Sequence, residues 1–110
     1  MLWKRDAMPK ERILVVDDEE DILELVRFNL LREGYDVRVA GSGEKAVDLT
    51  QKELPHLIIL DLMLPGIDGL EVTRILKHNP ETRQIPIVML TAKGGGPDVV
   101  AGLDLGAEDY

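Results

Sequence analysis

The sequence predicts an open α/β fold, in which a parallel β-sheet is covered by helices on both faces. Four short apolar runs recur along the chain, and segments with the apolar spacing of helices lie between them. Strands that alternate with helices in this way are joined by right-handed crossovers and lie parallel. The fold class therefore follows from the order of the apolar runs and from the helical spacing between them.

The first strand is predicted over 13–16, where four large aliphatic residues follow one another. An uninterrupted run of this kind is typical of a strand that is buried on both faces. Apolar residues then recur at helical spacing from Ile22 to Leu30. Gly34 follows at the position where a glycine commonly ends a helix, so the first helix is expected to stop there.

The second strand is predicted over 37–40, where Val37 and Val39 alternate with other residues. The second helix is indicated by apolar residues over 46–49, and Ser42 precedes them as a candidate N-terminal cap.

The third strand is predicted over 57–60, again as a strand buried on both faces. The apolar residues Val72, Ile75 and Leu76 predict the third helix, which Asn79-Pro80 should end because proline disfavours helical backbone before it.

The last predicted strand lies in the run 85–90, which Pro86 interrupts, and its part over 87–90 is expected to be buried on both faces. A fourth helix is indicated over Asp98–Leu105 and ends at Gly106.

The bulk composition limits the classes of function. The chain has 110 residues, of which 45% are hydrophobic, and we expect one domain over 11–110 after an N-terminal extension over 1–10. A formal net charge of -8 disfavours direct binding to nucleic acid or to anionic membranes. The chain contains no cysteine, which excludes thiol chemistry and disulfides, and it contains no run long enough to cross a bilayer. We therefore expect a cytoplasmic protein that makes no membrane contact.

Acidic residues follow two of the predicted strands directly. Asp17 and Asp18 end the first strand and Asp61 ends the third, while Thr91 ends the fourth. In an open parallel sheet the carboxyl ends of all strands lie at one edge, where ligands bind. These four side chains are therefore expected to gather at one place.

Three carboxylates at one edge repel one another, and a hard divalent cation such as Mg²⁺ would neutralise them. A pocket of this kind suits phosphoryl chemistry, in which a carboxylate attacks phosphorus. The alternative is that the acids of 17–21 only cap the following helix and favour its dipole, a role that suits Glu19, Glu20 and Asp21 best. Asp61 favours the cation site, because an acid at the end of a buried strand has no equally good capping role.

Four segments of the sequence resemble the receiver domain of bacterial two-component response regulators. The resemblance is carried by ILVVDDE at 13–19, LIILDLMLPGIDGLE at 57–71, IPIVMLTA at 85–92 and GLDLGAEDY at 102–110. The segments MLPGIDGLE and AEDY are most similar to the corresponding segments of regulators of the OmpR/PhoB type. The resemblance implies a flavodoxin-like fold with the strand order 2-1-3-4-5.

The resemblance also implies the roles of individual residues. Asp61 would be the phosphoacceptor and would take a phosphoryl group from the phosphohistidine of a sensor histidine kinase. Asp18 would bind Mg²⁺ directly, Asp17 would do so chiefly through water, and Met63 would offer its backbone carbonyl to the metal.

Two further residues would serve as the switch. Thr91 would hydrogen-bond a phosphoryl oxygen, and Tyr110 would move from an exposed to a buried position as Thr91 moves.

The domain would catalyse its own phosphorylation and dephosphorylation and would not be a metabolic enzyme. Its output would be transcription, through a DNA-binding output domain absent from this chain.

The sequence departs from the family pattern after Tyr110, where a lysine, a fifth strand and a last helix are expected. We expect that the chain is a fragment of a longer protein, or that a second copy covers the gap as a homodimer or a swapped oligomer.

Two rival functions also stay open. One is a Mg²⁺-dependent phosphatase with an Asp61 nucleophile, although Met63 stands where haloacid-dehalogenase-type phosphatases place a second aspartate. The other is a truncated receiver that acts only as an interaction module.

Overall fold

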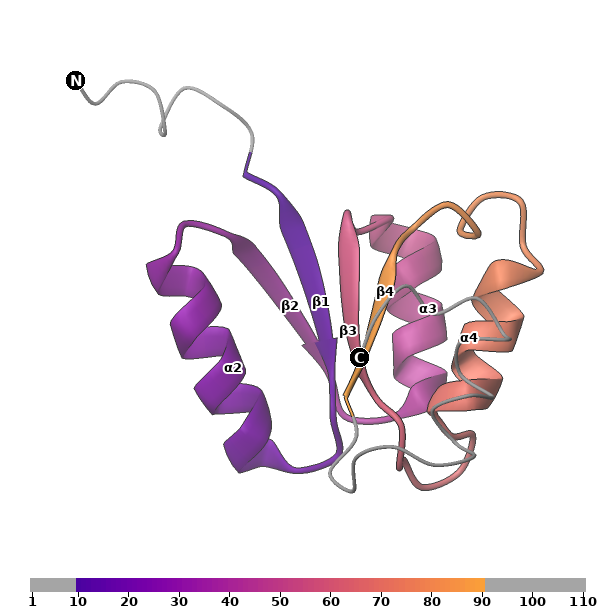
Figure 1. The fold of residues 1–110 in the computed structure, drawn as a ribbon, viewed down its shortest axis with the longest axis horizontal. Coiled ribbons are helices and arrows are strands. Elements are labelled where there is room, and N and C mark those ends of the chain that lie inside the picture. The colour runs from indigo at the N-terminus through magenta and orange to yellow at the C-terminus, as the bar shows by residue number, and fades with distance from the viewer. Residues whose placement is uncertain (1–9, 91–110) are drawn as a thin grey trace.

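A computed structural model describes residues 10–90 of the chain (Figure 1). The fourth predicted helix, Thr91 and Tyr110 lie outside the described residues, as does almost all of the expected N-terminal extension. The strands within 10–90 are β1 (Arg12–Val16), β2 (Asp36–Ala40), β3 (Leu57–Asp61) and β4 (Ile87–Leu90), and the helices are α2 (Glu20–Arg32), α3 (Gly43–Glu53) and α4 (Gly69–Lys77).

The four strands form one parallel sheet in the order β2-β1-β3-β4. This arrangement confirms the predicted fold class and the first four places of the predicted strand order. In the centre of the sheet, Val16 of β1 is paired with Leu60 of β3. The two central strands therefore end side by side.

The observed bounds of the four strands agree with the predicted ones to within one or two residues. The last strand begins at Ile87, after Pro86, and the carbonyl of Pro86 accepts a hydrogen bond of 3.0 Å from the N–H of Ile58. Proline has no N–H of its own, so it joins the ladder only as an acceptor and stands just before the strand. At the other end, β3 includes Asp61, which is paired with Leu90.

The two faces of the sheet carry cores of different size. Helices α3 and α4 lie on one face and α2 lies on the other (Figure 1). Beneath α3 and α4, the buried strand residues are Leu14, Val16, Ile58, Leu60, Ile87 and Met89. On the other face, Leu23 of α2 packs on Ile13 and Val15.

The expectation that three strands are buried on both faces holds for β1 alone. Residues 13–16 are all buried, whereas Ile59 of β3 and Val88 of β4 are only partly covered. The reason is the position of α2, which packs over β1 and β2. Within residues 10–90 no other helix lies on that face.

The helix ends follow the predicted signals. The hydroxyl of Ser42 accepts a hydrogen bond of 3.2 Å from the N–H of Lys45 and caps α3. Gly34 has a φ of 96°, and its N–H donates to the carbonyl of Leu31 at 3.0 Å, which closes the end of α2. Helix α4 ends at Lys77, before Asn79-Pro80 as expected.

The start of α4 is pressed against the end of β3. Gly69 is buried, and its N–H donates to the carbonyl of Leu62 at 3.0 Å. A Cβ atom on Gly69 would lie 2.5 Å from the backbone oxygen of Asp61 and 2.8 Å from the Cα of Leu62. These contacts are with backbone atoms, so only glycine allows the helix to approach β3 this closely.

We therefore predict that Gly69→Ala destabilises the domain by about 3 kcal/mol, because α4 must move away from β3. Denaturant unfolding followed by circular dichroism measures the change. The matched control is Gly41→Ala, since a Cβ at Gly41 meets no atom within 4 Å and should leave stability almost unchanged. Equal stability of the two variants would contradict the close packing described here.

Candidate functional site

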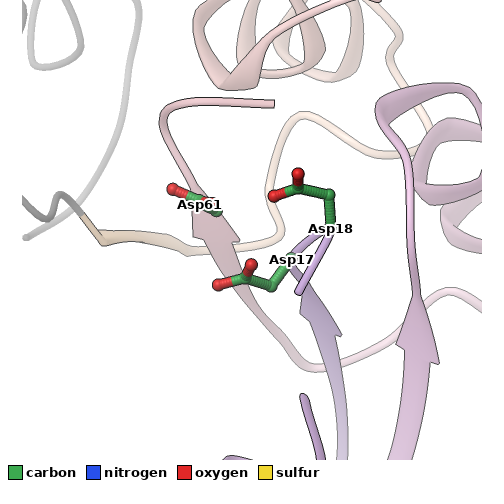
Figure 2. Close-up of side chains that lie close together, drawn as sticks. All are labelled: Asp17, Asp18 and Asp61. Carbon is green, nitrogen blue, oxygen red and sulfur yellow. The ribbon is translucent and has the colours of Figure 1, made fainter. Parts of the chain in front are cut away.

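Three carboxylates meet at the carboxyl edge of the sheet (Figure 2). Asp17 and Asp18 follow β1, and Asp61 is the last residue of β3. One oxygen from each residue can be chosen so that all three lie within 4.8 Å of one another. The structure thus brings together three of the four side chains that the sequence placed at this edge.

The Asp17 side chain is the most deeply buried of the three, with 5% of its surface exposed. Its Oδ1 accepts a hydrogen bond of 2.9 Å from the N–H of Glu19, and its own N–H donates to the carbonyl of Ala40 at 3.2 Å. These bonds fix the turn that joins β1 to α2. Asp17 is therefore held in place by backbone on both sides.

The expected capping role of Glu19 is wrong in its details. Glu19 occupies the N-cap position of α2, but its side chain makes no capping hydrogen bond. The carboxylate of Asp17 accepts the Glu19 N–H instead. The shorter side chain two residues earlier reaches this donor, in the manner of an Asx turn. Glu20 and Asp21 lie in the first turn, where acids favour the helix dipole as expected.

Asp61 is partly buried, and its Oδ1 accepts a hydrogen bond of 3.1 Å from the N–H of Met63. Loss of water around the carboxyl group raises the pKa of Asp61 above its ordinary value. The hydrogen bond from Met63 acts in the opposite direction, and the nearby charges of Asp17 and Asp18 raise the pKa further. A negative charge on Asp61 is thus disfavoured in the absence of a cation.

The donor set fits a hard divalent cation. All three side chains offer carboxylate oxygens, which are the ligands that Mg²⁺ prefers. Within residues 10–90, none of the three carboxylates forms an ion pair with lysine or arginine. The charge gathered there is therefore not neutralised by the side chains of the part of the chain that the structure describes.

Met63 lies next to the acids, with 55% of its surface exposed. Its N–H orients the Asp61 carboxylate, which is a contact that sequence reasoning did not foresee. The role expected for its carbonyl, as a metal ligand, stays a prediction. Thr91 and Tyr110 lie outside the described residues, so their expected roles stay predictions as well.

A pocket of about 390 Å³ opens beside Asp18. Its walls are mostly apolar, and a second carboxylate, that of Asp68, lies on its rim. The lining residues are Asp18, Leu62, Met63, Leu64, Pro65, Asp68 and Leu70.

Asp68 was not predicted as a site residue from the sequence. This residue caps α4 by accepting a hydrogen bond of 2.9 Å from the N–H of Glu71. The sequence does contain a pattern typical of a helix N-terminus here, because an acid followed by Glu three residues later resembles a capping box. Asp68 therefore fixes the helix start that borders the pocket.

The chain belongs to the response regulator receiver domain family, whose sequence model matches residues 13–110. The parallel sheet and the acidic edge are the fold and site that this class of protein uses. Three solved structures illustrate the similarity at the level of the whole chain.

A putative response regulator from Chloroflexus aurantiacus J-10-fl is 40% identical, with a TM-score of 0.88, and the match covers 93% of this chain and 84% of that one. The chemotaxis protein CheY4 of Vibrio cholerae is 28% identical, with a TM-score of 0.88 and coverage of 93% and 85%. The signal receiver domain of a histidine kinase from Syntrophus aciditrophicus is 35% identical, with a TM-score of 0.83 and coverage of 91% and 76%. These matches confirm the family that the sequence resembles.

The helices of residues 10–90 are all too short or too polar to cross a bilayer.

The raised pKa of Asp61 predicts how stability depends on pH. A carboxyl group with a raised pKa contributes stability below its unfolded pKa, and this contribution is lost as the pH rises through the folded pKa. Asp61→Asn removes the charge and keeps an oxygen for the N–H of Met63. Without divalent cations, we expect its melting temperature at pH 7 to exceed that of the wild type by a few degrees. The difference should vanish near pH 3, which lies about one unit below the ordinary pKa of aspartic acid.

Thermal unfolding by circular dichroism at several pH values measures this effect. Glu81→Gln is the matched control, because it also removes one negative charge but at an exposed position outside the acidic edge. An Asp61→Asn variant no more stable at pH 7 than the Glu81→Gln variant would contradict the crowding of charge at Asp61.

Proposed function

We propose that this domain is a phosphoacceptor switch in which Asp61 takes a phosphoryl group from a sensor histidine kinase. The observation that carries the proposal is the meeting of Asp17, Asp18 and Asp61 at the carboxyl edge of the sheet. A catalytic edge of this kind provides an acceptor and a cation site in one place. Family membership supports the same role.

Asp61 is the residue placed to act as the nucleophile. The N–H of Met63 donates to Oδ1 and fixes the plane of the carboxylate, so Oδ2 is the oxygen that attacks phosphorus. The new O–P bond forms as the P–N bond of the phosphohistidine breaks. The electron pair of that bond returns to the ring nitrogen of the donor. The other ring nitrogen carries the proton, so the donor leaves as a neutral histidine.

Asp17 and Asp18 are the residues that would hold Mg²⁺ beside Asp61, with the carbonyl of Met63 as the further ligand that the family resemblance implies. When bound, this ion would neutralise charge on the phosphoryl oxygens as they approach the carboxylates. Asp18, which is exposed, would contact the ion directly. Asp17 is buried, and one of its oxygens already accepts the N–H of Glu19, so its other oxygen would be the one available to the ion.

The proposal also includes control of transcription as the output of the domain. The segments MLPGIDGLE and AEDY favour the OmpR/PhoB type, in which a receiver controls transcription through a separate DNA-binding domain. The net charge of -8 supports a division of labour in which this domain does not bind DNA itself. We place the domain in the cytoplasm, where it would phosphorylate and dephosphorylate itself without acting as a metabolic enzyme.

Phosphorylation by a small donor tests the acceptor role. We predict that acetyl phosphate with Mg²⁺ adds one phosphoryl group to the wild-type chain and none to Asp61→Asn, because the amide is not a nucleophile for phosphorus. Intact-mass spectrometry measures the product. Treatment with hydroxylamine should remove the group from the wild type, since an acyl phosphate is labile to it.

Two results would contradict the proposal. One is a phosphoryl group of equal yield in the Asp61→Asn variant, which would place the acceptor elsewhere. The other is rapid turnover of phosphate esters without accumulation of a phosphorylated chain, which would favour the phosphatase.

Metal binding gives an independent prediction. Asp18→Asn keeps the size of the side chain but removes a charge from the donor set, so we expect Mg²⁺ to bind about tenfold more weakly. Isothermal titration calorimetry measures the affinity. The matched control is Glu20→Gln, which removes a nearby acid that lies in the first turn of α2 and outside the cluster. Equal weakening by both variants would show that Mg²⁺ responds only to overall charge.

A further inference from the structure

Met63 is an exposed methionine beside the proposed acceptor. It follows Asp61 by two residues, and 55% of its surface is open to solvent. Its N–H donates to Oδ1 of Asp61 at 3.1 Å, so its backbone lies against the acceptor carboxylate. Met63 also lines the pocket of about 390 Å³, together with Asp18. A chemical change in the Met63 side chain would therefore take place at the entrance to the acceptor.

The exposure of Met63 makes its thioether open to oxidants in solution. The sulfur of methionine is soft and polarisable, and peroxides convert it to a sulfoxide. Residues 10–90 contain one other methionine, Met89, which is fully buried in the core beneath α3 and α4. An oxidant can thus reach Met63 while the domain is folded, whereas Met89 is protected by the packing around it.

We propose that Met63 is an oxidation site, at which hydrogen peroxide slows the phosphorylation of Asp61. The inference rests on the proposed function, since it assigns a control to the same acceptor. The thioether sulfur attacks one oxygen of hydrogen peroxide, and the new S–O bond forms as the O–O bond breaks. The hydroxide that leaves takes the proton of the transferred oxygen and becomes water. The sulfur is thereby oxidised by two electrons, and the peroxide is reduced.

The sulfoxide changes the electrostatic character of the approach to Asp61. Its oxygen carries partial negative charge, whereas the thioether is nearly apolar. This oxygen would be added beside the three carboxylates of Figure 2, none of which forms an ion pair with lysine or arginine of residues 10–90. A phosphoryl donor is itself an anion, so a further negative dipole at this edge opposes its approach. Oxidation should therefore slow transfer to Asp61.

The backbone around Met63 is held independently of its side chain. The neighbouring residues Leu62 and Leu64 are both buried in the core, with 4% and 7% of their surfaces exposed. The N–H of Leu62 also donates to the carbonyl of Leu90 at 2.9 Å. Because these contacts do not involve the thioether, its oxidation need not move the backbone or unfold the domain. We therefore expect oxidation to change the rate of phosphorylation and to leave the fold intact.

Phosphorylation after mild treatment with hydrogen peroxide tests the proposal. Treated and untreated chains receive acetyl phosphate with Mg²⁺, and intact-mass spectrometry follows the gain of the phosphoryl group. We expect the treatment to slow phosphorylation of the wild type at least about threefold, and methionine sulfoxide reductases to restore the original rate. Peptide mapping should place a sulfoxide at Met63 and find Met89 unmodified. Circular dichroism verifies that the treated chain remains folded.

The variant Met63→Leu separates oxidation at this position from oxidation elsewhere. Leucine is similar in size to methionine and has no sulfur, and the variant retains Met1, Met8 and Met89. Whatever its own rate before treatment, peroxide should not change that rate. Met89→Leu is the matched control, because it makes the same substitution at the buried methionine. Peroxide should slow its phosphorylation by the same factor as that of the wild type.

Three results would overturn the inference. One is equal slowing of the wild type and of Met63→Leu by peroxide, which would assign the effect to another residue. The second is a wild-type chain that is fully oxidised at Met63 and still accepts phosphate at its untreated rate. The third is slowing that accompanies a loss of helical circular dichroism, which would assign it to unfolding. Failure of the proposed function is a different result, because the untreated chain would then accept no phosphoryl group, and it would overturn this inference as well.

Discussion

The site depends on the parallel pairing of β1 with β3. Because Val16 lies opposite Leu60, the next residues along the two strands, Asp17 and Asp61, must lie close together. The strands cannot slide to separate these charges, since a shift of one residue would turn the buried aliphatic side chains of both strands to the wrong faces. The apolar core therefore holds the carboxylates together against their mutual repulsion. A cation is the ligand that relieves this repulsion without any change in the fold.

The fold also gives the three acids different surroundings. Asp17 is buried and bonded to backbone, Asp18 is exposed, and Asp61 is partly buried with a raised pKa. Identical side chains can therefore serve different purposes: Asp17 holds the β1–α2 turn, Asp18 reaches toward solvent, and Asp61 is the proposed acceptor. The close approach of Gly69 to the end of β3 keeps Asp61 in position, because it fixes the backbone on which that side chain stands.

Most of the fold could be predicted from the sequence because each strand is a continuous apolar run and each helix has a clear end signal. The gathering of the three acids followed from parallel topology alone, before any coordinates. Partial burial of Ile59 and Val88 could not be predicted, because it depends on where α2 lies on the sheet and not on the strands themselves. The choice of Asp17, and not Glu19, as the acceptor of a backbone N–H at the start of α2 could not be predicted for a similar reason. Several acids in a row can all reach a helix N-terminus, and only the geometry of the turn selects one of them.

Helix α2 borders the acidic edge, and its two sides have different surroundings. Its inner side is anchored by Leu23 on Ile13 and Val15, and its first turn follows directly on Asp17 and Asp18. The contact of α2 with the sheet therefore supports the turn that carries these acids. Its outer side, with Leu25, Phe28 and Leu31, is exposed and makes no contribution to that contact. Because protein interiors are closely packed, the inner contact holds the helix as a rigid support for the turn that carries Asp17 and Asp18.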